Sequence, residues 1–408
     1  MIINMKQIEG SVTAPKGFRA SGIHCGIRKN RAKKDLALIA AGKECAAAAV
    51  YTGNKVKGAP LIVTAEHLKN GRAQAVICNS GNANTCNADG IEIADQMSAG
   101  TAKALGISPE DVIVASTGVI GQPLPLDKIT AALPRLAEDL SDRGFAAAEE
   151  AIMTTDTRRK GTAVEFMLGG KTCRIGGIAK GSGMIHPNMA TLLSFLTTDA
   201  AIAPGMLHEA LLRSVQKTYN MVSIDGDTST NDMASILASG LAGNAEITAP
   251  GADFDAFCAG LDTVLVYLAK EIARDGEGAS RLIECVVEGA ADEAAARAVA
   301  KAVISSNLLK AAIFGADANW GRVLCAVGNA SADVDVQKVD VSFESEGGSL
   351  QVCKAGYGVD FSENQARAVL VADEIVIRVG LNSGSATATA WGCDLTYDYV
   401  KINGDYRT

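Results

Sequence analysis

The chain has few aromatic residues and none of the features that mark a membrane or nucleic-acid-binding protein. Aromatics make up 4% of its 408 residues, so a core must be filled mainly by alanine, valine, isoleucine and leucine. No window approaches the roughly eighteen consecutive apolar residues of a membrane-spanning helix, and the N-terminus has no signal-peptide segment. A net charge of −8 offers no basic surface to nucleic acid or anionic lipid. We therefore expect small-molecule substrates, neither nucleic acid nor membrane as a partner, and a cytoplasmic location.

Paired cysteines and metal motifs are also missing. The ten cysteines are scattered and form no C-x-x-C pair, which is typical of reduced core thiols and not of a disulfide framework or a zinc site. The acidic segment 223–232 superficially resembles a calcium loop, but Gly226 directly follows Asp225 and the EF-hand spacing is absent. We interpret this segment as a polar loop and predict no bound metal.

Hydropathy patterns predict a mixed α and β chain without a regular βαβ rhythm. A length of 408 residues indicates two domains or one large one. The pattern changes near residue 281, so we expect domains at 1–280 and 281–408. Helical patterns cover 91–105, 127–140 with a kink near Pro134, 145–153, 206–219, 254–272 and 292–303. Strand-like runs cover 36–40, 61–64, 75–78, 112–115, 191–198, 282–287, 339–343, 374–381 and 396–400.

The stretch 180–199 combines a loop with a strand. Its first half has the glycines and the proline of an irregular loop, and residues 191–198 are β-branched and apolar. Ala190 is small, so the carbonyl of the 190–191 peptide is open to attack by the Thr191 hydroxyl. Cleavage there would give Thr191 a free α-amine beside its hydroxyl, an activated nucleophile that needs no histidine such as His186. On local sequence alone, a threonine after such a loop is more often simply the first residue of a strand.

Other polar segments have ordinary interpretations when taken singly. The loop 79–84, rich in asparagine and glycine, is uninformative as chemistry. Thr117 and Gly118 follow the strand predicted at 112–115, where they form either a plain turn or an oxyanion pocket. Taken singly, residues 154–157 are most simply a helix cap, and Lys180 is a surface charge. Glu277 is an exposed residue in a glycine turn, and the tail 401–408 is a frayed terminus.

This interpretation changes when one segment is taken as a whole, Lys180-Gly-Ser-Gly-Met-Ile-His-Pro-Asn-Met-Ala-Thr191. It resembles the signature of the ornithine acetyltransferase family, the bifunctional arginine-biosynthesis glutamate N-acetyltransferases. Further segments resemble the same family, so the resemblance covers essentially the whole chain. They are Ser-Thr-Gly-Val-Ile-Gly at 116–121, Thr-Thr-Asp at 154–156, Gly-Glu-Gly at 276–278, Gly-Ala-Asp-Ala-Asn-Trp-Gly-Arg at 315–322, and the C-terminal tail.

The resemblance implies self-cleavage between Ala190 and Thr191, which gives chains 1–190 and 191–408, commonly assembled as two of each. It implies ping-pong transfer of an acetyl group from N2-acetylornithine to glutamate, with the acetyl group carried by Thr191 and the oxyanion bound by Thr117 and Gly118. Substrate contacts are implied for Thr154, Lys180, Thr191, Glu277, Asn403 and Thr408. We expect no cofactor. Acetyl-CoA as a second donor stays open, because no motif identifies a CoA site.

The implied fold is α+β, with helix layers around stacked sheets in an αββα sandwich. It is similar to but distinct from the N-terminal-nucleophile hydrolases, and a smaller C-terminal α/β domain sends its tail to the active site. Two other function classes stay open. An amidase or aminopeptidase would use the same nucleophile with water as acceptor, although the implied substrate contacts favour transfer. A non-catalytic amino-acid-binding protein would keep the 190–191 bond intact.

Overall fold

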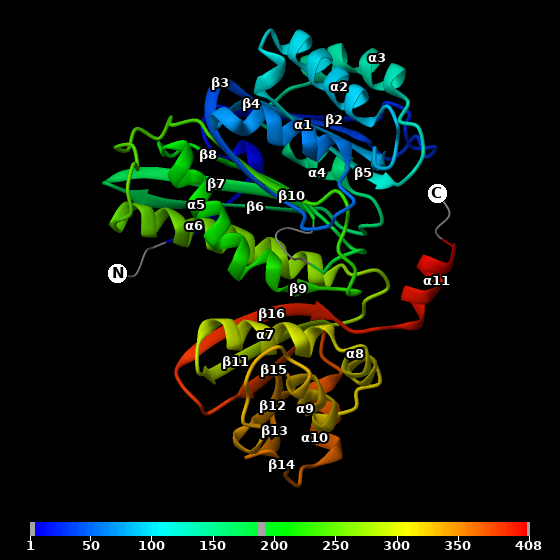
Figure 1. Ribbon diagram of the computed structural model, residues 1–408, viewed down its shortest axis with the longest axis vertical. Helices are drawn as coiled ribbons and strands as arrows, with labels where there is room; N and C mark the ends of the chain where they lie inside the picture. Colours follow the sequence, from blue (N-terminus) through cyan, green and yellow to red (C-terminus); the bar gives the residue numbers. More distant parts are fainter. Residues whose placement is uncertain (1–4, 187–191, 406–408) are drawn as a thin grey trace. The chain divides into compact units, whose positions relative to one another are not determined.

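The computed structural model describes residues 5–186 and 192–405, and the chain forms two compact units (Figure 1). The first unit comprises 1–181, 188–216 and 228–268, and the second comprises 182–187, 217–227 and 269–408. The division expected near residue 281 therefore lies inside the second unit. The physical reason is the long helix α6 (Ala252–Arg274), whose last turn is held by partners in the second unit. Lys270 pairs with Glu284, and Arg274 pairs with Glu374.

The first unit is built on a sheet of nine strands. Their order is β1-β6-β7-β8-β10-β3-β4-β5, and β2 pairs with β3 outside this path. The strands are β1 (Lys6–Ile8), β2 (Phe18–Ile23), β3 (Leu36–Tyr51), β4 (Arg72–Asn82), β5 (Val112–Val119), β6 (Lys160–Leu168), β7 (Lys171–Lys180), β8 (Leu193–Thr198) and β10 (Met233–Ala238). The helices are α1 (Ala59–His67), α2 (Gly90–Leu105), α3 (Leu126–Glu138), α4 (Phe145–Ile152), α5 (Pro204–Lys217) and α6.

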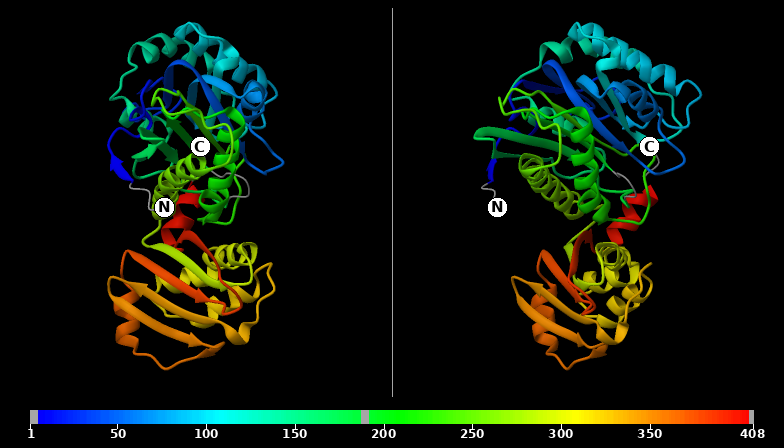
Figure 2. Two further views of the ribbon diagram at one scale, coloured as in Figure 1. Left: turned by 90° about the vertical axis from the view of Figure 1, so that its left-hand side faces the viewer. Right: turned by 60° about the vertical axis from the view of Figure 1, so that its left-hand side comes forward.

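Alternating apolar residues give this unit its layers. Along β3, β4 and β5, one set of side chains packs against α2 and α3, and the alternate set forms a second core with α4, β7, β8 and β10. Ile178 and Phe195 belong to that second core. On the other face of β7 lies α6, because a Cβ on Gly177 would lie 3.2 Å from Val264 and Leu268. The layers run helix, sheet, sheet, helix (Figure 2), as expected for an αββα sandwich. Hydrogen bonds between β10 and β3 join the two sheet layers.

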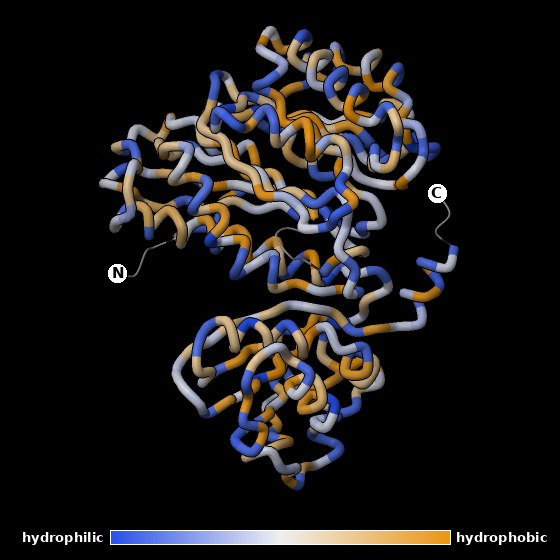
Figure 3. Tube along the Cα trace, in the orientation of Figure 1, coloured by the Kyte–Doolittle hydropathy of each residue, from blue (hydrophilic) through white to orange (hydrophobic). Residues whose placement is uncertain are grey.

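The second unit contains a seven-stranded sheet in the order β14-β13-β12-β15-β11-β16-β9. Its strands are β9 (Val222–Ser223), β11 (Leu282–Ala290), β12 (Asp340–Ser345), β13 (Gly348–Lys354), β14 (Tyr357–Gly358), β15 (Glu374–Gly380) and β16 (Ala386–Cys393). Its helices are α7 (Glu293–Ser305), α8 (Asn307–Phe314), α9 (Trp320–Gly328), α10 (Glu363–Leu370) and α11 (Tyr397–Asp405). Hydrophobic residues gather along the strands of both units (Figure 3). Within the described ranges, no helix is long and apolar enough to cross a bilayer.

Most long helical patterns are confirmed, and two short runs predicted as strands are wrong. The run 61–64 lies in α1, where Pro60 occupies the first turn, a position at which proline favours a helix. The run 396–400 lies at the start of α11, and the Thr396 hydroxyl accepts a hydrogen bond from the Asp398 N–H (3.2 Å). Tyr397 and Val400 of this run face solvent, at 84% and 68% exposed, whereas Thr396 is buried.

Candidate functional site

The residues predicted to bind an oxyanion lie inside β5 and not in a loop after it. Parallel pairing with β4 continues past residue 115 and places Ser80 opposite Thr117 and Gly81 opposite Gly118. Gly118 has a φ of +134°, and a Cβ there would lie 2.3 Å from the carbonyl carbon of Gly81, so only glycine fits. Thr117 is buried, and among the described residues its hydroxyl has no hydrogen-bond partner. That hydroxyl is therefore available to a ligand.

The asparagine-rich segment 79–84, predicted as a loop without a role, instead forms the end of β4 and the two residues after it, and it supports this strand end. The Ser116 hydroxyl donates to Asn79 Oδ1 (2.6 Å). Asn231 Nδ2 donates to the carbonyls of Ala83 (2.6 Å) and Ser116 (3.0 Å). Since these asparagines are buried and bonded on both sides, they fix the backbone next to Thr117. The high asparagine content of 79–84 was the only feature of the sequence that pointed to this support of the backbone beside Thr117.

Thr154 and Lys180 come together around a carboxylate that sequence analysis missed. Asp156 Oδ2 accepts the N–H of Thr154 (2.9 Å), and Asp156 Oδ1 accepts the N–H of Gly181 (2.8 Å). Lys180 is only 9% exposed, and its ammonium has no hydrogen bond or ion pair within the described part of the chain. A buried cation without a partner is costly unless an anionic ligand pairs with it.

A second buried carboxyl, that of Asp232, is also affected by the charge of Lys180. Burial raises the pKa of Asp232 well above its usual range, and the hydrogen bond from Ser229 and the charge of Lys180 only partly oppose this. Its Oδ2 has no hydrogen-bond partner among the described residues. Asp232 immediately precedes β10, whose first residue, Met233, pairs with Leu193 at the start of β8. A buried carboxyl with a raised pKa therefore lies beside the start of β8.

In the second unit, Glu277 and Asn403 are directly bonded. Asn403 Nδ2 donates to Glu277 Oε2 (2.8 Å), and the N–H of Glu277 donates to the carbonyl of Ser182 (2.8 Å). A Cβ on Gly183 would lie 2.4 Å from Glu277 Oε2, so the glycine lets the carboxylate approach the backbone. Asn403 lies in α11 and not in a frayed tail, which explains how it is held near Glu277.

Asp225 connects residues 184 and 185 with the same helix. Its carboxylate accepts the N–H groups of Met184 (2.6 Å) and Ile185 (2.9 Å). Burial raises the pKa of Tyr399, and the charges of Asp225 and Glu277 and a hydrogen bond with Asp225 raise it further. Tyr399 therefore stays a neutral phenol, one turn before Asn403. The polar loop 223–232 thus has a structural role that its sequence did not reveal.

His186 is held by the same segment of the second unit. Its Nδ1 lies 2.9 Å from Ser223 Oγ, and Lys301 Nζ donates to the carbonyls of Asn220 and Val222 (2.7 Å each). Burial lowers the pKa of His186 to about 4, and the charge of Lys301 contributes. The imidazole is therefore neutral near pH 7.

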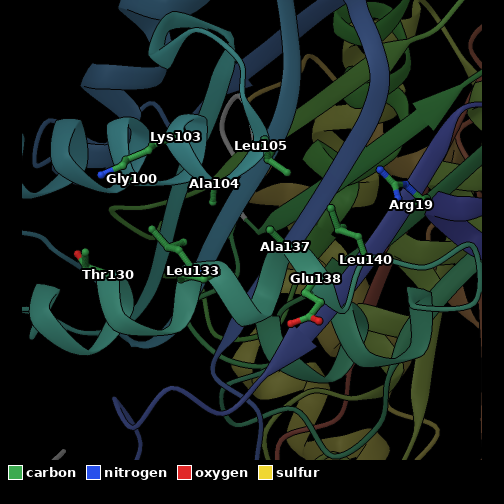
Figure 4. A pocket seen from close by; sticks show the side chains of 11 residues that line it. Arg19, Gly100, Lys103, Ala104, Leu105, Thr130, Leu133, Ala137, Glu138 and Leu140 are labelled. Atoms are coloured by element: carbon green, nitrogen blue, oxygen red, sulfur yellow. The ribbon is translucent and has the colours of Figure 1, made fainter.

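Three of the predicted site residues, Ala190, Thr191 and Thr408, lie outside the described residues. In residues 5–186 and 192–405, no three histidine, cysteine, aspartate or glutamate side chains are grouped so that they could bind a metal. A hollow of about 680 Å³ lies between α2 and α3 (Figure 4). Its lining includes Lys103, Leu133 and Glu138 but no predicted site residue, so we assign it no role.

Comparison with known proteins gives consistent matches. The sequence pattern of the ArgJ family matches residues 19–408. The "Arginine biosynthesis bifunctional protein ArgJ" of Symbiobacterium thermophilum is 53% identical over 99% of this chain and 100% of that protein. "ArgJ 1" of Clostridium acetobutylicum is 50% identical over 98% of both. A crystal structure of the Bacillus halodurans protein of this name is 46% identical with a TM-score of 0.50, and covers 52% of this chain and 98% of that chain.

The lowered pKa of His186 predicts how stability depends on pH. The unfolded chain takes up a proton near the ordinary histidine value of 6.5, whereas the folded state does so only near 4. Between these values the unfolded state binds more protons, so the free energy of unfolding falls as the pH falls. In urea titrations at pH 7 and at pH 4, His186→Gln should lose less stability than the parent protein. Equal losses in the two proteins would contradict the assignment.

Proposed function

Because the chain belongs to the ArgJ family, we propose that it transfers an acetyl group from N2-acetylornithine to glutamate through an acetylated Thr191. The observation that carries this proposal is Lys180, which is only 9% exposed and whose ammonium has no hydrogen bond or ion pair among the described residues. Asp156 ties the backbone of Thr154 to that of Gly181, the residue after Lys180. Both amino-acid substrates have a carboxylate that such a cation would bind. We assign Thr154 to the substrate as a hydroxyl partner.

The first half of the proposed reaction removes the acetyl group from N2-acetylornithine. The Thr191 hydroxyl attacks the acetyl carbonyl, and the α-amine of the same residue takes the hydroxyl proton. Thr117 Oγ1 and the Gly118 N–H donate to the oxyanion that forms. The carbon–nitrogen bond then breaks, the proton passes to the departing amine, and ornithine leaves the acetylated enzyme.

The second half reverses these steps with glutamate. Its α-amine attacks the acetyl carbon on Thr191, the Thr191 amine accepts the proton, and the ester oxygen of Thr191 leaves as the hydroxyl. We assign Glu277 to an ammonium group of the amino acids, and Asn403 and Thr408 to their polar groups. The hydrogen bond from Asn403 to Glu277 supports this assignment because it orients the carboxylate. These steps require no cofactor, and we propose none.

We further propose that the chain is processed between Ala190 and Thr191. The matching chain in the Bacillus halodurans crystal structure supports this, since 52% of the present sequence accounts for 98% of it. Curated relatives instead match over their whole length. Residues 191–408 make up about 53% of the chain, so a solved chain of that size is expected if a processed piece was crystallised. An assembly of two chains of each kind and a cytoplasmic location complete the proposal.

The relatives' name, "bifunctional", supports a second activity in which acetyl-CoA replaces N2-acetylornithine as donor. With acetyl-CoA as the only donor, the purified protein should acetylate glutamate. With N2-acetylornithine, it should release ornithine and form N-acetylglutamate in equal amounts. Chromatography of the products distinguishes the alternatives: free acetate without N-acetylglutamate would indicate an amidase, and binding without turnover would indicate a binding protein.

The oxyanion assignment predicts the effect of one substitution. Removing one such donor lowers the rate about 10²–10³-fold, so Thr117→Ala should reduce kcat by about that factor with little change in KM. Thr101→Ala is the matched control, because Thr101 is also buried but its hydroxyl donates to Met97 in α2. Steady-state kinetics should show a normal kcat in the control. A normal kcat in Thr117→Ala would remove Thr117 from the oxyanion pocket.

A further inference from the structure

Asp156 lies four residues before β6, contacts Gly181 just after β7, and forms a fully buried ion pair. Its side chain and that of Lys160 are each 0% exposed, and Lys160 Nζ lies 2.7 Å from Asp156 Oδ1. Lys160 pairs with Ala179 in the β6–β7 ladder, one residue before Lys180. The pair therefore occupies the strand end from which the loop toward residue 191 departs.

The Asp156 carboxylate connects two segments that are far apart in the chain. One oxygen accepts the N–H of Thr154, and the other accepts both the Lys160 ammonium and the N–H of Gly181. The Thr154 hydroxyl lies 3.5 Å from the first oxygen. A neutral amide has only one acceptor oxygen and could not accept from both segments. The bridge from Thr154 to the end of β7 therefore requires a carboxylate.

The two buried lysines near this carboxylate, Lys160 and Lys180, interact with it in different ways. Burial would raise the pKa of Asp156, but the charges of Lys160 and Lys180 and its hydrogen bonds hold the pKa well below its usual range. Lys160 forms the ion pair with Asp156. Lys180 forms no such pair among the described residues, although its charge also acts on the Asp156 carboxylate.

We propose that Asp156 is a positioning residue that holds the Thr154 hydroxyl and the Lys180 ammonium in fixed relation to bind the substrate, and that Lys160 neutralises Asp156 so that Lys180 stays available. This inference rests on the proposed acetyl transfer. It predicts that the loss of Asp156 weakens the binding of both amino-acid substrates, because both would contact the Thr154 hydroxyl and the Lys180 ammonium.

The test compares Asp156→Asn with the double variant Asp156→Asn/Lys160→Met. The single variant leaves the Lys160 charge unpaired and should lose stability. The double variant removes both charges and should regain stability, while the bridge between Thr154 and Gly181 stays broken. We expect KM for N2-acetylornithine and for glutamate to rise about tenfold or more in the double variant, with kcat less affected. Asp199→Asn is the matched control, because Asp199 is buried and accepts the N–H groups of Lys16 and Arg174 at the opposite end of β7.

The outcomes separate the positioning role of Asp156 from the proposed acetyl transfer. An increased KM in a double variant of near-parent stability, with normal KM values in Asp199→Asn, supports a positioning role. A double variant that regains both stability and the parent KM values would show that Asp156 is only structural. If the parent itself transfers no acetyl group, the proposed function fails. Calorimetric titration with glutamate then tests the inference separately, and equal affinity in parent and double variant would overturn it.

Discussion

The antiparallel pairing of β7 with β8 is the constraint on which the rest of the site depends. It places Lys180, the last residue of β7, opposite Leu193, the first residue of β8. The segment that contains the 190–191 bond is therefore anchored at both ends on adjacent strands, although twelve residues separate its attachment points in sequence. Parallel pairing of β10 with β8 adds Asp232 to the same strand end. Asn231, the preceding residue, bonds the carbonyl of Ser116 beside Thr117.

Among the described residues, some buried polar groups at this strand end have hydrogen-bond partners and others do not. Both oxygens of Asp156 accept hydrogen bonds, and the carboxylate stays ionised. In contrast, the Lys180 ammonium, the Thr117 hydroxyl and one oxygen of Asp232 have no hydrogen-bond partner among the described residues. Fully satisfied groups hold a backbone in place, whereas unsatisfied buried groups favour a ligand that supplies the missing partner. The first kind supports the site, and the second kind is suited to contact the substrate.

The hydropathy pattern predicted the long helices better than the residues that support the motif segments. Long amphipathic helices such as α2 were predictable because an apolar stripe persists over several turns. The central part of β3 was not, since Ala46 to Ala49 have no β propensity and become a strand only through pairing with β10. The motif indicated Thr154 and Lys180 but not the carboxylate that connects them. A single aspartate has no periodicity, and only the β6–β7 register shows that it lies next to Gly181.

The central claim is that Thr191 is freed by cleavage and carries the acetyl group. The most direct test is mass spectrometry of the purified protein before and after incubation with N2-acetylornithine in the absence of glutamate. We expect two chains, 1–190 and 191–408, and one added acetyl group on the N-terminal threonine of the second chain, which glutamate then removes. An uncut chain that transfers acetyl groups, or an acetyl group found on a residue other than Thr191 during turnover, would contradict the account.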